Sequence, residues 1–296
     1  MTQRLLKNII PSEWRRELAV LLNTFKNERL KKQILNHYKD YQGEDNYLQE
    51  ALRYLESNNL KVFPYPFQDK YEHIPCEVLF DSSCGLHYVL WMGKRLYFKR
   101  SWSKRRIVAY HRSIFCEQDT ASAHCYLPAN FTFNANDVIA DIGCAEANFT
   151  LTHIDTIQKA ILVERDHEWI EALEQTFKPY LHKIKIINKY AGSHENEHTT
   201  TLDAIHKNNP FNFLKMDLDG SERPVFEGGH LLWNSTSPIH VVVCTYHQAQ
   251  DAEEFKQFFE SKHFACRFTE GYMLFIFQKQ HQAPFFRKGV LRAIRL

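Results

Sequence analysis

The sequence lacks a run of about 18 consecutive apolar residues, the length that a membrane-spanning helix needs. It also lacks an excess of one charge, because 37 basic and 35 acidic residues leave a formal net charge of +2. A balanced charge provides no general attraction to nucleic acid or to a membrane surface. We therefore expect neither of these as a partner.

Cysteine pairs and a signal sequence are missing as well. The seven cysteines form no C-x-x-C pair and no spacing typical of a disulfide framework, which favours reduced thiols. The first residues contain no long apolar core with a small-residue cleavage site, so we expect no secretory signal. These features predict a cytoplasmic protein. With 44% hydrophobic residues in 296, the chain can bury one large core or two unequal domains.

The first 125 residues have the patterns of helices and of a small antiparallel sheet. Apolar residues recur at helical spacing from Ser12 and again from Leu48. Short strand-like runs separated by turns follow, and another helical pattern spans residues 101–118. The strand-like runs cover residues 76–80, 86–91 and 96–99. We expect residues 1–125 to cap a substrate site or to mediate homo-oligomer formation.

From Val138 onward, strand-like runs alternate with segments long enough for right-handed crossovers between parallel strands. The five runs cover residues 138–142, 160–163, 183–188, 211–216 and 240–244. A helical pattern at residues 251–261 precedes two close runs, 264–268 and 273–277, which we expect to pair as an antiparallel hairpin. Residues 126–296 therefore predict an α/β domain with a seven-stranded Rossmann-like sheet, five strands being of the parallel type.

The first of these strands ends in a turn of small residues that opens a helix, Asp141-Ile-Gly-Cys-Ala-Glu-Ala-Asn-Phe-Thr150. In open α/β sheets, nucleotide-like ligands bind in the crevice beyond the carboxyl ends of the strands. Gly143 and Ala145 let the backbone approach such a ligand and bring a helix N-terminus up to it. We therefore predict a nucleotide or nucleoside-cofactor site centred on Asp141 and Gly143.

The composition of this turn separates two classes of cofactor. The dinucleotide fingerprint G-x-G-x-x-G admits a pyrophosphate, but here only Gly143 is present and Glu146 adds a negative charge. Both features favour S-adenosylmethionine, whose sulfonium is cationic, and a NAD-dependent oxidoreductase is the alternative enzyme. Glu164 ends the second strand about 20 residues later, where a carboxylate accepts ribose hydroxyls. The alternative for Glu164 is a pairing with Arg165 or with the following helix.

A second group of polar residues follows the fourth and fifth predicted strands. Asp217, Asp219 and Glu222 gather beyond the end of the fourth strand, and the fifth strand leads to His247 at the same edge. Carboxylates with a histidine can deprotonate a hydroxyl or hold a divalent cation, so these four residues are the metal candidates. The alternative is an ion-pair network that includes Lys215.

These features together resemble the FkbM-type methyltransferases, a branch of the class I S-adenosylmethionine-dependent superfamily. The matching residues are Asp141-Ile-Gly-Cys-Ala-Glu-Ala-Asn-Phe-Thr-Leu151, Val163-Glu164, Thr201-Leu-Asp203, Lys215-Met-Asp-Leu-Asp-Gly-Ser-Glu222 and Thr245-Tyr-His247 with Asp251. The resemblance covers about residues 117–277, and the K-x-D-x-[ED]-G-x-E pattern is its most specific part. It implies methyl transfer from S-adenosylmethionine to oxygen, typically to a hydroxyl of a sugar or a secondary metabolite.

Such a reaction needs a base for the hydroxyl proton and a pocket for the methyl donor. His247 is the first choice for the base, and Asp217 or a carboxylate-bound metal is the second. Lys215 would orient a carboxylate or stabilise developing oxyanion charge. The residues expected to bind the cofactor are Asp141, Gly143, Cys144, Ala145, Glu164, Tyr190 and Ala191, the last two at its adenine.

Two parts of the chain depart from the family pattern. The family usually has G-A-N-x-G in the turn, where this chain has G-C-A-E-A ending at Ala147. We expect the methyl group of Ala147 to be tolerated in a right-handed helix, and Asp219 to shorten the reach of the usual glutamate. Since the other residues predicted to bind the cofactor are kept, we expect binding to persist. A non-catalytic scaffold that only binds the cofactor is the remaining alternative.

Overall fold

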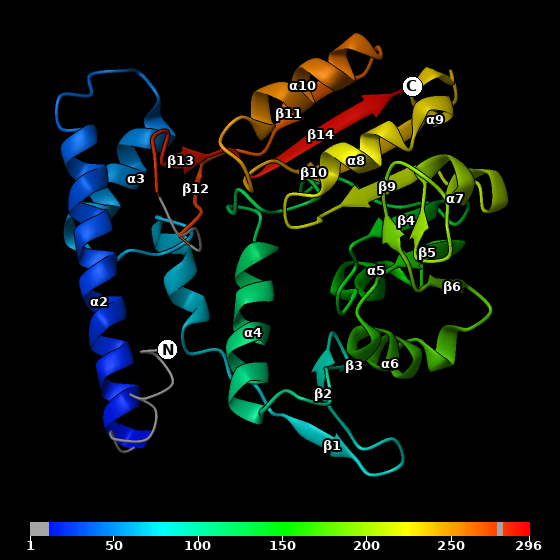
Figure 1. The fold of residues 1–296 in the computed structure, drawn as a ribbon, viewed down its shortest axis with the longest axis horizontal. Helices are drawn as coiled ribbons and strands as arrows, with labels where there is room; N and C mark the ends of the chain where they lie inside the picture. Colours follow the sequence, from blue (N-terminus) through cyan, green and yellow to red (C-terminus); the bar gives the residue numbers. More distant parts are fainter. Residues whose placement is uncertain (1–11, 277–280) are drawn as a thin grey trace, which may run out of the picture. The chain divides into compact units, whose positions relative to one another are not determined.

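The computed structural model describes residues 12–276 and 281–296, with side chains from residue 24 onward. The chain divides into two compact units (Figure 1). One comprises the chain up to Pro66 together with residues 272–286, and the other comprises residues 67–271 and 287–296. The predicted boundary between residues 125 and 126, and the roles predicted for its two sides, stay predictions.

The first unit contains the two long helices that the helical spacing predicts, α2 (Ser12–His37) and α3 (Asn46–Ser57). Asp45 caps α3, because its carboxylate accepts a hydrogen bond from the backbone N–H of Leu48 at 3.0 Å. One face of α3 is buried, formed by Leu48, Ala51, Tyr54 and Leu55. The apolar positions predicted in α2 before residue 24 lie outside the described side chains, and Phe25, which continues that pattern, is exposed.

The second unit begins with a 3₁₀ helix, η2 (Pro66–Tyr71), and the small antiparallel sheet that the sequence predicts. Its strands are β1 (Leu79–Asp81), β2 (Leu86–Trp91) and β3 (Lys94–Tyr97), followed by helix α4 (Lys104–Glu117). Two buried or half-buried hydrogen bonds join this sheet to later helices: Tyr97 N–H to Thr176 Oγ1 at 3.0 Å, and Trp91 Nε1–H to Thr152 Oγ1 at 2.8 Å. The meander is therefore built into the α/β unit.

The main sheet has seven strands in the order β11-β14-β10-β9-β4-β5-β6. Their bounds are β4 (Val138–Ile142), β5 (Lys159–Val163), β6 (Ile184–Ile187), β9 (Phe213–Met216), β10 (Ile239–Cys244), β11 (Ala265–Phe268) and β14 (Val290–Arg295). Strands β4, β5, β6, β9 and β10 pair in parallel, which confirms the five predicted parallel-type strands. The fold is an α/β domain with a seven-stranded Rossmann-like sheet, as predicted.

Helices cover both faces of this sheet (Figure 1). Their bounds are α5 (Asn148–His153), α6 (His167–Thr176), η3 (Lys178–Tyr180), α7 (Leu202–Asn208), α8 (Glu222–Glu227), α9 (His230–Asn234) and α10 (Asp251–Ser261). The apolar face of the strands packs against Phe226, Trp233, Phe255 and Phe259 of α8, α9 and α10 in one buried cluster. The short strands β7 (Tyr190–Ala191) and β8 (Thr199–Thr200) form a separate parallel pair.

The predicted hairpin partner is wrong. Strand β11 does not pair with residues 273–276, and Phe277 lies outside the described residues. Instead β14 lies between β10 and β11 and is antiparallel to both, while β12 (Met273–Leu274) pairs with β13 (Phe286–Arg287). The six residues of β14 pair with all six of β10, and Val290, Leu291 and Ala293 are fully buried. The burial of β14 between two strands outweighs the entropic advantage of the shorter loop in a local hairpin.

Among the described residues, no helix combines the length and the apolarity that crossing a bilayer requires.

Candidate active site

The turn after β4 needs glycine at position 143 for two reasons. Gly143 has φ +69°, and a Cβ atom there would lie 2.2 Å from the backbone oxygen of Asp217. Its N–H donates to the carbonyl of Val163 at 2.9 Å. The close approach that the sequence predicted is therefore one to the chain's own backbone at the end of β9, which fixes the turn against the neighbouring strands.

Two alanines of this turn also adopt left-handed backbone conformations. Ala145 has φ 46°, and Ala147, the N-cap of α5, has φ 56° and ψ 39°. The expectation that Ala147 lies in a right-handed helix is wrong, because the residue stands one position before the helix begins. Left-handed backbone costs a residue with a Cβ about 1–2 kcal/mol, which explains why a glycine is common at such positions.

The double substitution Ala145→Gly and Ala147→Gly should raise the free energy of unfolding by about 1 kcal/mol. Relief of the left-handed strain at two positions exceeds the extra entropy, about 0.5–1 kcal/mol each, that glycine loses on folding. Denaturant unfolding measures the change. Ala204→Gly, in the right-handed helix α7, is the matched control and should lose about 1 kcal/mol. A double variant that is also less stable than the unsubstituted protein would contradict the strain.

Beneath the turn lies a buried ion pair. Lys215 Nζ is 3.0 Å from Asp141 Oδ1 and donates to the carbonyl of Gly143 at 3.1 Å. Thr150 Oγ1–H donates to Asp141 Oδ2 at 2.8 Å. Burial alone would lower the pKa of Lys215, but the carboxylates of Asp141 and Asp217 raise it overall, so the ammonium stays charged. Lys215 thus orients a carboxylate, as predicted for one of its two roles, and holds the turn in place.

The carboxylate of Glu164, directly after β5, accepts three backbone hydrogen bonds. Oε2 accepts from Ala145 N–H at 3.2 Å, and Oε1 accepts from Arg165 and Asp166 N–H at 2.8 Å each. The predicted alternative, a link to Arg165 and to the start of α6, is therefore present. Glu164 also lines the cleft beside the turn, so it remains placed for a ribose.

A cleft of about 520 Å³ opens beyond these strand ends. The residues predicted for the site that line it are Gly143, Ala145, Glu164, Tyr190, Ala191, Asp217 and Asp219. Those that lie buried behind it are Asp141, Cys144, Lys215, Glu222 and His247. The sequence therefore located the cleft, and the structure divides the predicted residues into a lining layer and a supporting layer.

An aromatic wall on one side of the cleft was not predicted. It consists of Trp102, Tyr110 and Trp169, with ring centroids of the two tryptophans 5.1 Å apart and those of Trp102 and Tyr110 5.0 Å apart. Lys99 Nζ lies 4.8 Å from the centre of the Trp169 ring and 2.5 Å from Asp166 Oδ2. The aromatic content of residues 62–110 is the signal that could have indicated this wall.

Tyr110 connects the wall to a buried carboxyl group. Its hydroxyl donates to Glu146 Oε2 at 2.6 Å, and Glu146 is only 4% exposed. Burial raises the pKa of Glu146 to about 7, even though the hydrogen bond from Tyr110 lowers it. Because this folded-state pKa is above that of an exposed glutamate, the folded state loses stability as the pH rises towards 7.

Replacement of Glu146 by glutamine should therefore stabilise the protein at pH 8 but not at pH 4.5. The amide cannot ionise, and a shift from 4.5 to about 7 corresponds to roughly 3 kcal/mol at most. Denaturant unfolding across this pH range gives the difference between variant and parent. Glu253→Gln, on the exposed face of α10, should show no such pH dependence. Equal differences at both pH values would contradict the assignment.

His247 lies between two carboxylates beyond the end of β10. Nδ1 is 3.1 Å from Glu222 Oε1, and Nε2 is 3.5 Å from Asp217 Oδ1. Buried Arg287 donates hydrogen bonds to the carbonyls of Tyr246 and His247, which fixes the backbone of this segment. Burial alone would lower the pKa of His247, but the bond to Glu222 and the charge of Asp217 raise it above its usual value.

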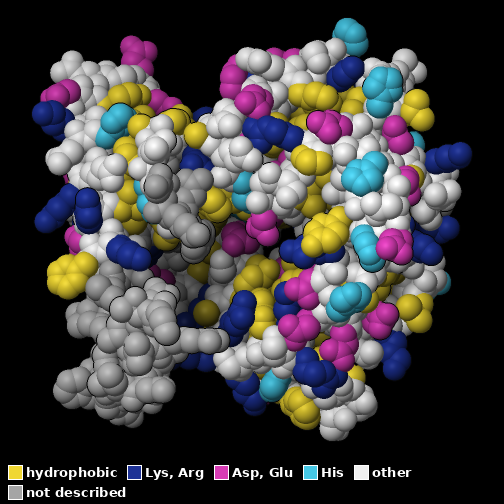
Figure 2. Space-filling model, in the orientation of Figure 1, with side chains coloured by type: hydrophobic (Ala, Val, Ile, Leu, Met, Phe, Trp, Pro, Cys, Tyr) yellow, Lys and Arg dark blue, Asp and Glu magenta, His cyan; other side chains and the backbone are white. Residues whose placement is uncertain are grey.

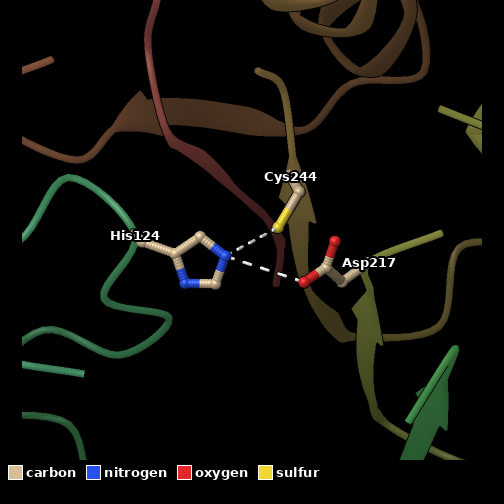
Figure 3. Close-up of side chains that lie close together, drawn as sticks. All are labelled: His124, Asp217 and Cys244. Carbon is tan, nitrogen blue, oxygen red and sulfur yellow. Dashed lines mark hydrogen bonds and ion pairs between the residues drawn. The ribbon is translucent and has the colours of Figure 1, made fainter. Parts of the chain in front are cut away.

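Asp217 receives contacts from residues that sequence reasoning missed. Tyr126 O–H donates to Asp217 Oδ2 at 3.0 Å, and His124 Nε2 lies 3.6 Å from the same oxygen (Figure 3). Burial alone would raise the pKa of Asp217, but His124, Lys215 and His247 hold it well below its usual range. His124 lies in the loop between α4 and β4. Its proximity to Asp217 depends on how this loop folds over the strand ends, which the sequence pattern does not show.

Asp219, one of the four predicted metal candidates, and Asp251, which belongs to the family pattern, lie apart from this cluster. The Asp219 side chain is fully exposed, with φ 52° and an Oδ1 atom 3.9 Å from His247 Nε2. Asp251 instead caps its own loop by accepting from Gln248 N–H at 2.6 Å and pairs with Arg223 at 2.8 Å. Of the four metal candidates, Asp217, Glu222 and His247 have ligand atoms within 4.8 Å of one another, and Asp219 is not among them.

Comparison with known families identifies the α/β domain that contains this cleft. Residues 147–272 match the model of the methyltransferase FkbM domain. The chain carries an FkbM-type methyltransferase domain. No curated protein matches the chain. The family match begins at the N-cap of α5 and ends after β11, so it includes Glu164, the acidic segment after β9 and His247.

Several solved structures are similar to the FkbM-type domain and its surroundings. The methyltransferase FkbM from Methylobacillus flagellatus KT shares 14% identity over 63% of this chain and 52% of its own, with a TM-score of 0.46. The tRNA m1G37 methyltransferase from M. jannaschii shares 16% identity over 77% and 66%, with a TM-score of 0.40. The C-terminal domain of precorrin-6Y C5,15-methyltransferase from Rhodobacter capsulatus shares 12% over 55% and 81%, with a TM-score of 0.38. This chain spans about half the length of the M. flagellatus protein.

Proposed function

We propose that this protein transfers a methyl group from S-adenosylmethionine to a hydroxyl of a sugar or a small metabolite. The observation that carries the proposal is the arrangement of Asp217 and His247. Asp217 lines the cleft, and the Nε2 atom of His247 lies behind it at 3.5 Å. A hydroxyl that binds in the cleft can therefore donate its hydrogen bond to Asp217, which can pass the proton on to His247.

The residues of the cleft fit the cofactor that the family implies. Its volume of about 520 Å³ is within the range of small-molecule sites. Four carboxylates, those of Glu164, Asp166, Asp217 and Asp219, line it together with the cations of Lys99, Arg165 and Lys189. This composition suits a cationic, zwitterionic ligand and disfavours a pyrophosphate. Glu164 would hold the ribose, and Tyr190 and Ala191 would lie at the adenine.

S-adenosylmethionine supplies an activated methyl group, so the protein's part is alignment and proton removal. Asp217 accepts the hydrogen bond of the acceptor hydroxyl and orients it, since its lowered pKa keeps the carboxylate ionised. The proton passes through this carboxylate to Nε2 of His247, 3.5 Å behind it, and Glu222 fixes the ring through Nδ1. Lys215 acts indirectly, because it holds Asp141 and the carbonyl of Gly143 in position. A divalent cation at Asp217, Glu222 and His247 is the second route to the same proton removal.

We infer that the acceptor is a small molecule or a saccharide and that the protein acts in the cytoplasm. Over the face of the α/β unit in Figure 2, basic and acidic side chains are interspersed, and a nucleic-acid-binding surface is typically dominated by Lys and Arg. The formal net charge of +2 supports the same inference. A homo-oligomer, predicted from the N-terminal helices, stays a prediction.

Titration with S-adenosylmethionine and with NADH, by calorimetry, tests the cofactor. We expect S-adenosylmethionine alone to bind, and Glu164→Gln to weaken its Kd about 10- to 100-fold, because charged hydrogen bonds contribute about 1.5–3 kcal/mol. Glu174→Gln, exposed on the neighbouring helix α6, is the matched control and should not change the Kd. Preferential binding of NADH would contradict the methyltransferase assignment. Tight S-adenosylmethionine binding without methyl transfer would instead support a scaffold.

A further inference from the structure

Three metal-ligating side chains converge on one point at the carboxyl ends of the strands (Figure 3). His124 comes from the loop before β4, Asp217 follows β9, and Cys244 is the last residue of β10. His124 Nε2 lies 3.6 Å from Asp217 Oδ2 and 3.7 Å from Cys244 Sγ. The hydroxyl of Tyr246 lies 3.1 Å from the same nitrogen.

Hydrogen bonds link these side chains through the hydroxyl of Tyr246, which lies 3.1 Å from His124 Nε2 and donates to Asp217 Oδ1 at 3.4 Å. The Nε2 atom of a histidine has either one hydrogen or one lone pair, so it makes one good hydrogen bond at a time. Here the hydroxyl of Tyr246 at 3.1 Å is that partner, while Asp217 Oδ2 at 3.6 Å lies beyond the usual distance for an N–H donor to oxygen and Cys244 Sγ at 3.7 Å lies within the range for sulfur. A nitrogen, a sulfur and a carboxylate oxygen therefore lie together around one point, which is a donor set that can also bind a metal ion.

The spacing matches the size of a tetrahedral ion. Zinc bonds nitrogen and oxygen at about 2.0–2.2 Å and sulfur at about 2.3 Å, which sets ligand atoms roughly 3.3–3.6 Å apart. The two distances from Nε2 are 3.6 and 3.7 Å, and all three ligand atoms lie within 4.8 Å of one another, so side-chain adjustments would complete the site. Nitrogen, sulfur and oxygen together select zinc or a neighbouring transition metal, whereas magnesium and calcium prefer oxygen alone.

The position of the site indicates an open metal rather than a closed structural one. His124 is 3% exposed and Cys244 is fully buried, whereas the Asp217 side chain is 23% exposed and lines the cleft. Three protein ligands with a fourth position towards a cleft are the pattern of catalytic zinc. Tyr126 O–H donates to Asp217 Oδ2, as an outer hydrogen bond that would orient the ligand.

We propose that His124, Asp217 and Cys244 bind one Zn²⁺-like transition-metal ion whose fourth position faces the cleft. This site is distinct from the group of Asp217, Glu222 and His247, with which it shares one carboxylate. Binding of the ion does not depend on the proposed methyl transfer. An acceptor oxygen bound at the fourth position would connect the metal site with that reaction.

Zinc binding to protein without a histidine tag tests the proposal. The chelator-treated chain should take up one Zn²⁺ in equilibrium dialysis, and Co²⁺ in its place should give a sulfur-to-cobalt charge-transfer band. Cys244→Ser should abolish the band and weaken Zn²⁺ by more than about 100-fold, since ligands matter more than the outer shell that accounts for 10- to 100-fold. Cys266→Ser, a half-buried thiol in β11, is the matched control and should keep both.

Two further variants separate the neighbouring groups of ligands. His124→Gln should lose Zn²⁺ binding, and Glu222→Gln should retain it together with the cobalt band. Far-UV circular dichroism and S-adenosylmethionine affinity in chelator show whether each variant folds, so a failed methyltransferase assignment is told apart from a missing metal site. No zinc uptake by the folded parent, a band that persists in Cys244→Ser, or binding that Glu222→Gln alone removes would each overturn the proposal.

Discussion

Replacement of His247 by glutamine should lower kcat by about 10²- to 10⁴-fold, the contribution of a general base. The Kd of S-adenosylmethionine should not change, because His247 is buried behind the cleft lining and its Nε2 faces Asp217 rather than the glycine turn. Glutamine can still hydrogen-bond to Glu222, so the loop should keep its conformation. Stopped assays of methyl transfer and calorimetric titration of the cofactor measure the two constants.

His247 should also set the pH dependence of kcat/KM. The carboxylates around His247 raise its pKa, so the neutral ring that accepts a proton forms only above the ordinary histidine value of about 6.5. kcat/KM should therefore rise with pH through an inflexion above 6.5 and lose this inflexion in His247→Gln. His240→Gln, at the opposite end of the same strand β10, is the matched control. Full activity of His247→Gln, or an unchanged profile, would remove His247 as the base.

Replacement of Lys215 by methionine should reduce the free energy of unfolding by about 3–5 kcal/mol. The substitution keeps the length of the side chain but leaves the carboxylate of Asp141, which is fully buried, without its cation. The carbonyl of Gly143 loses its donor at the same time. Denaturant unfolding at neutral pH measures the loss.

A double variant separates the effect of the unpaired charge from the effect of lost packing. Asp141→Asn together with Lys215→Met removes both charges, and the amide oxygen can still accept from Thr150. The double variant should recover much of the lost stability, because no unpaired charge remains buried. A single Lys215→Met variant that loses less than about 1 kcal/mol, or a double variant that loses the sum of both single losses, would contradict this role of the pair.

Periodicity in the sequence predicted most of the sheet, because parallel strands buried on both faces appear as short apolar runs. The predicted runs at residues 138–142 and 240–244 correspond to β4 and β10 within one residue. The error at the C-terminus has a physical cause. A pattern within one window favours the nearest partner, whereas β14 pairs across a long connection because its place between β10 and β11 buries Val290 and Leu291 completely.

The candidate site was predictable where the chain order determines position and not where side chains from distant segments meet. Asp217, Glu164 and Gly143 follow strands that end at one edge, so their proximity followed from topology. The sequence pattern did not reveal the contact of His124 with Cys244, which are 120 residues apart. It also did not reveal the left-handed backbone at Ala147, since a helix pattern cannot distinguish its first residue from the cap before it.

The most direct measurement is transfer of a labelled methyl group from S-adenosylmethionine into a cell extract, followed by identification of the labelled product. The account predicts a label on the oxygen of a saccharide or small metabolite, present with the parent protein and lost with His247→Gln. Label on nucleic acid, or no label above that given by His247→Gln while S-adenosylmethionine still binds, would contradict it.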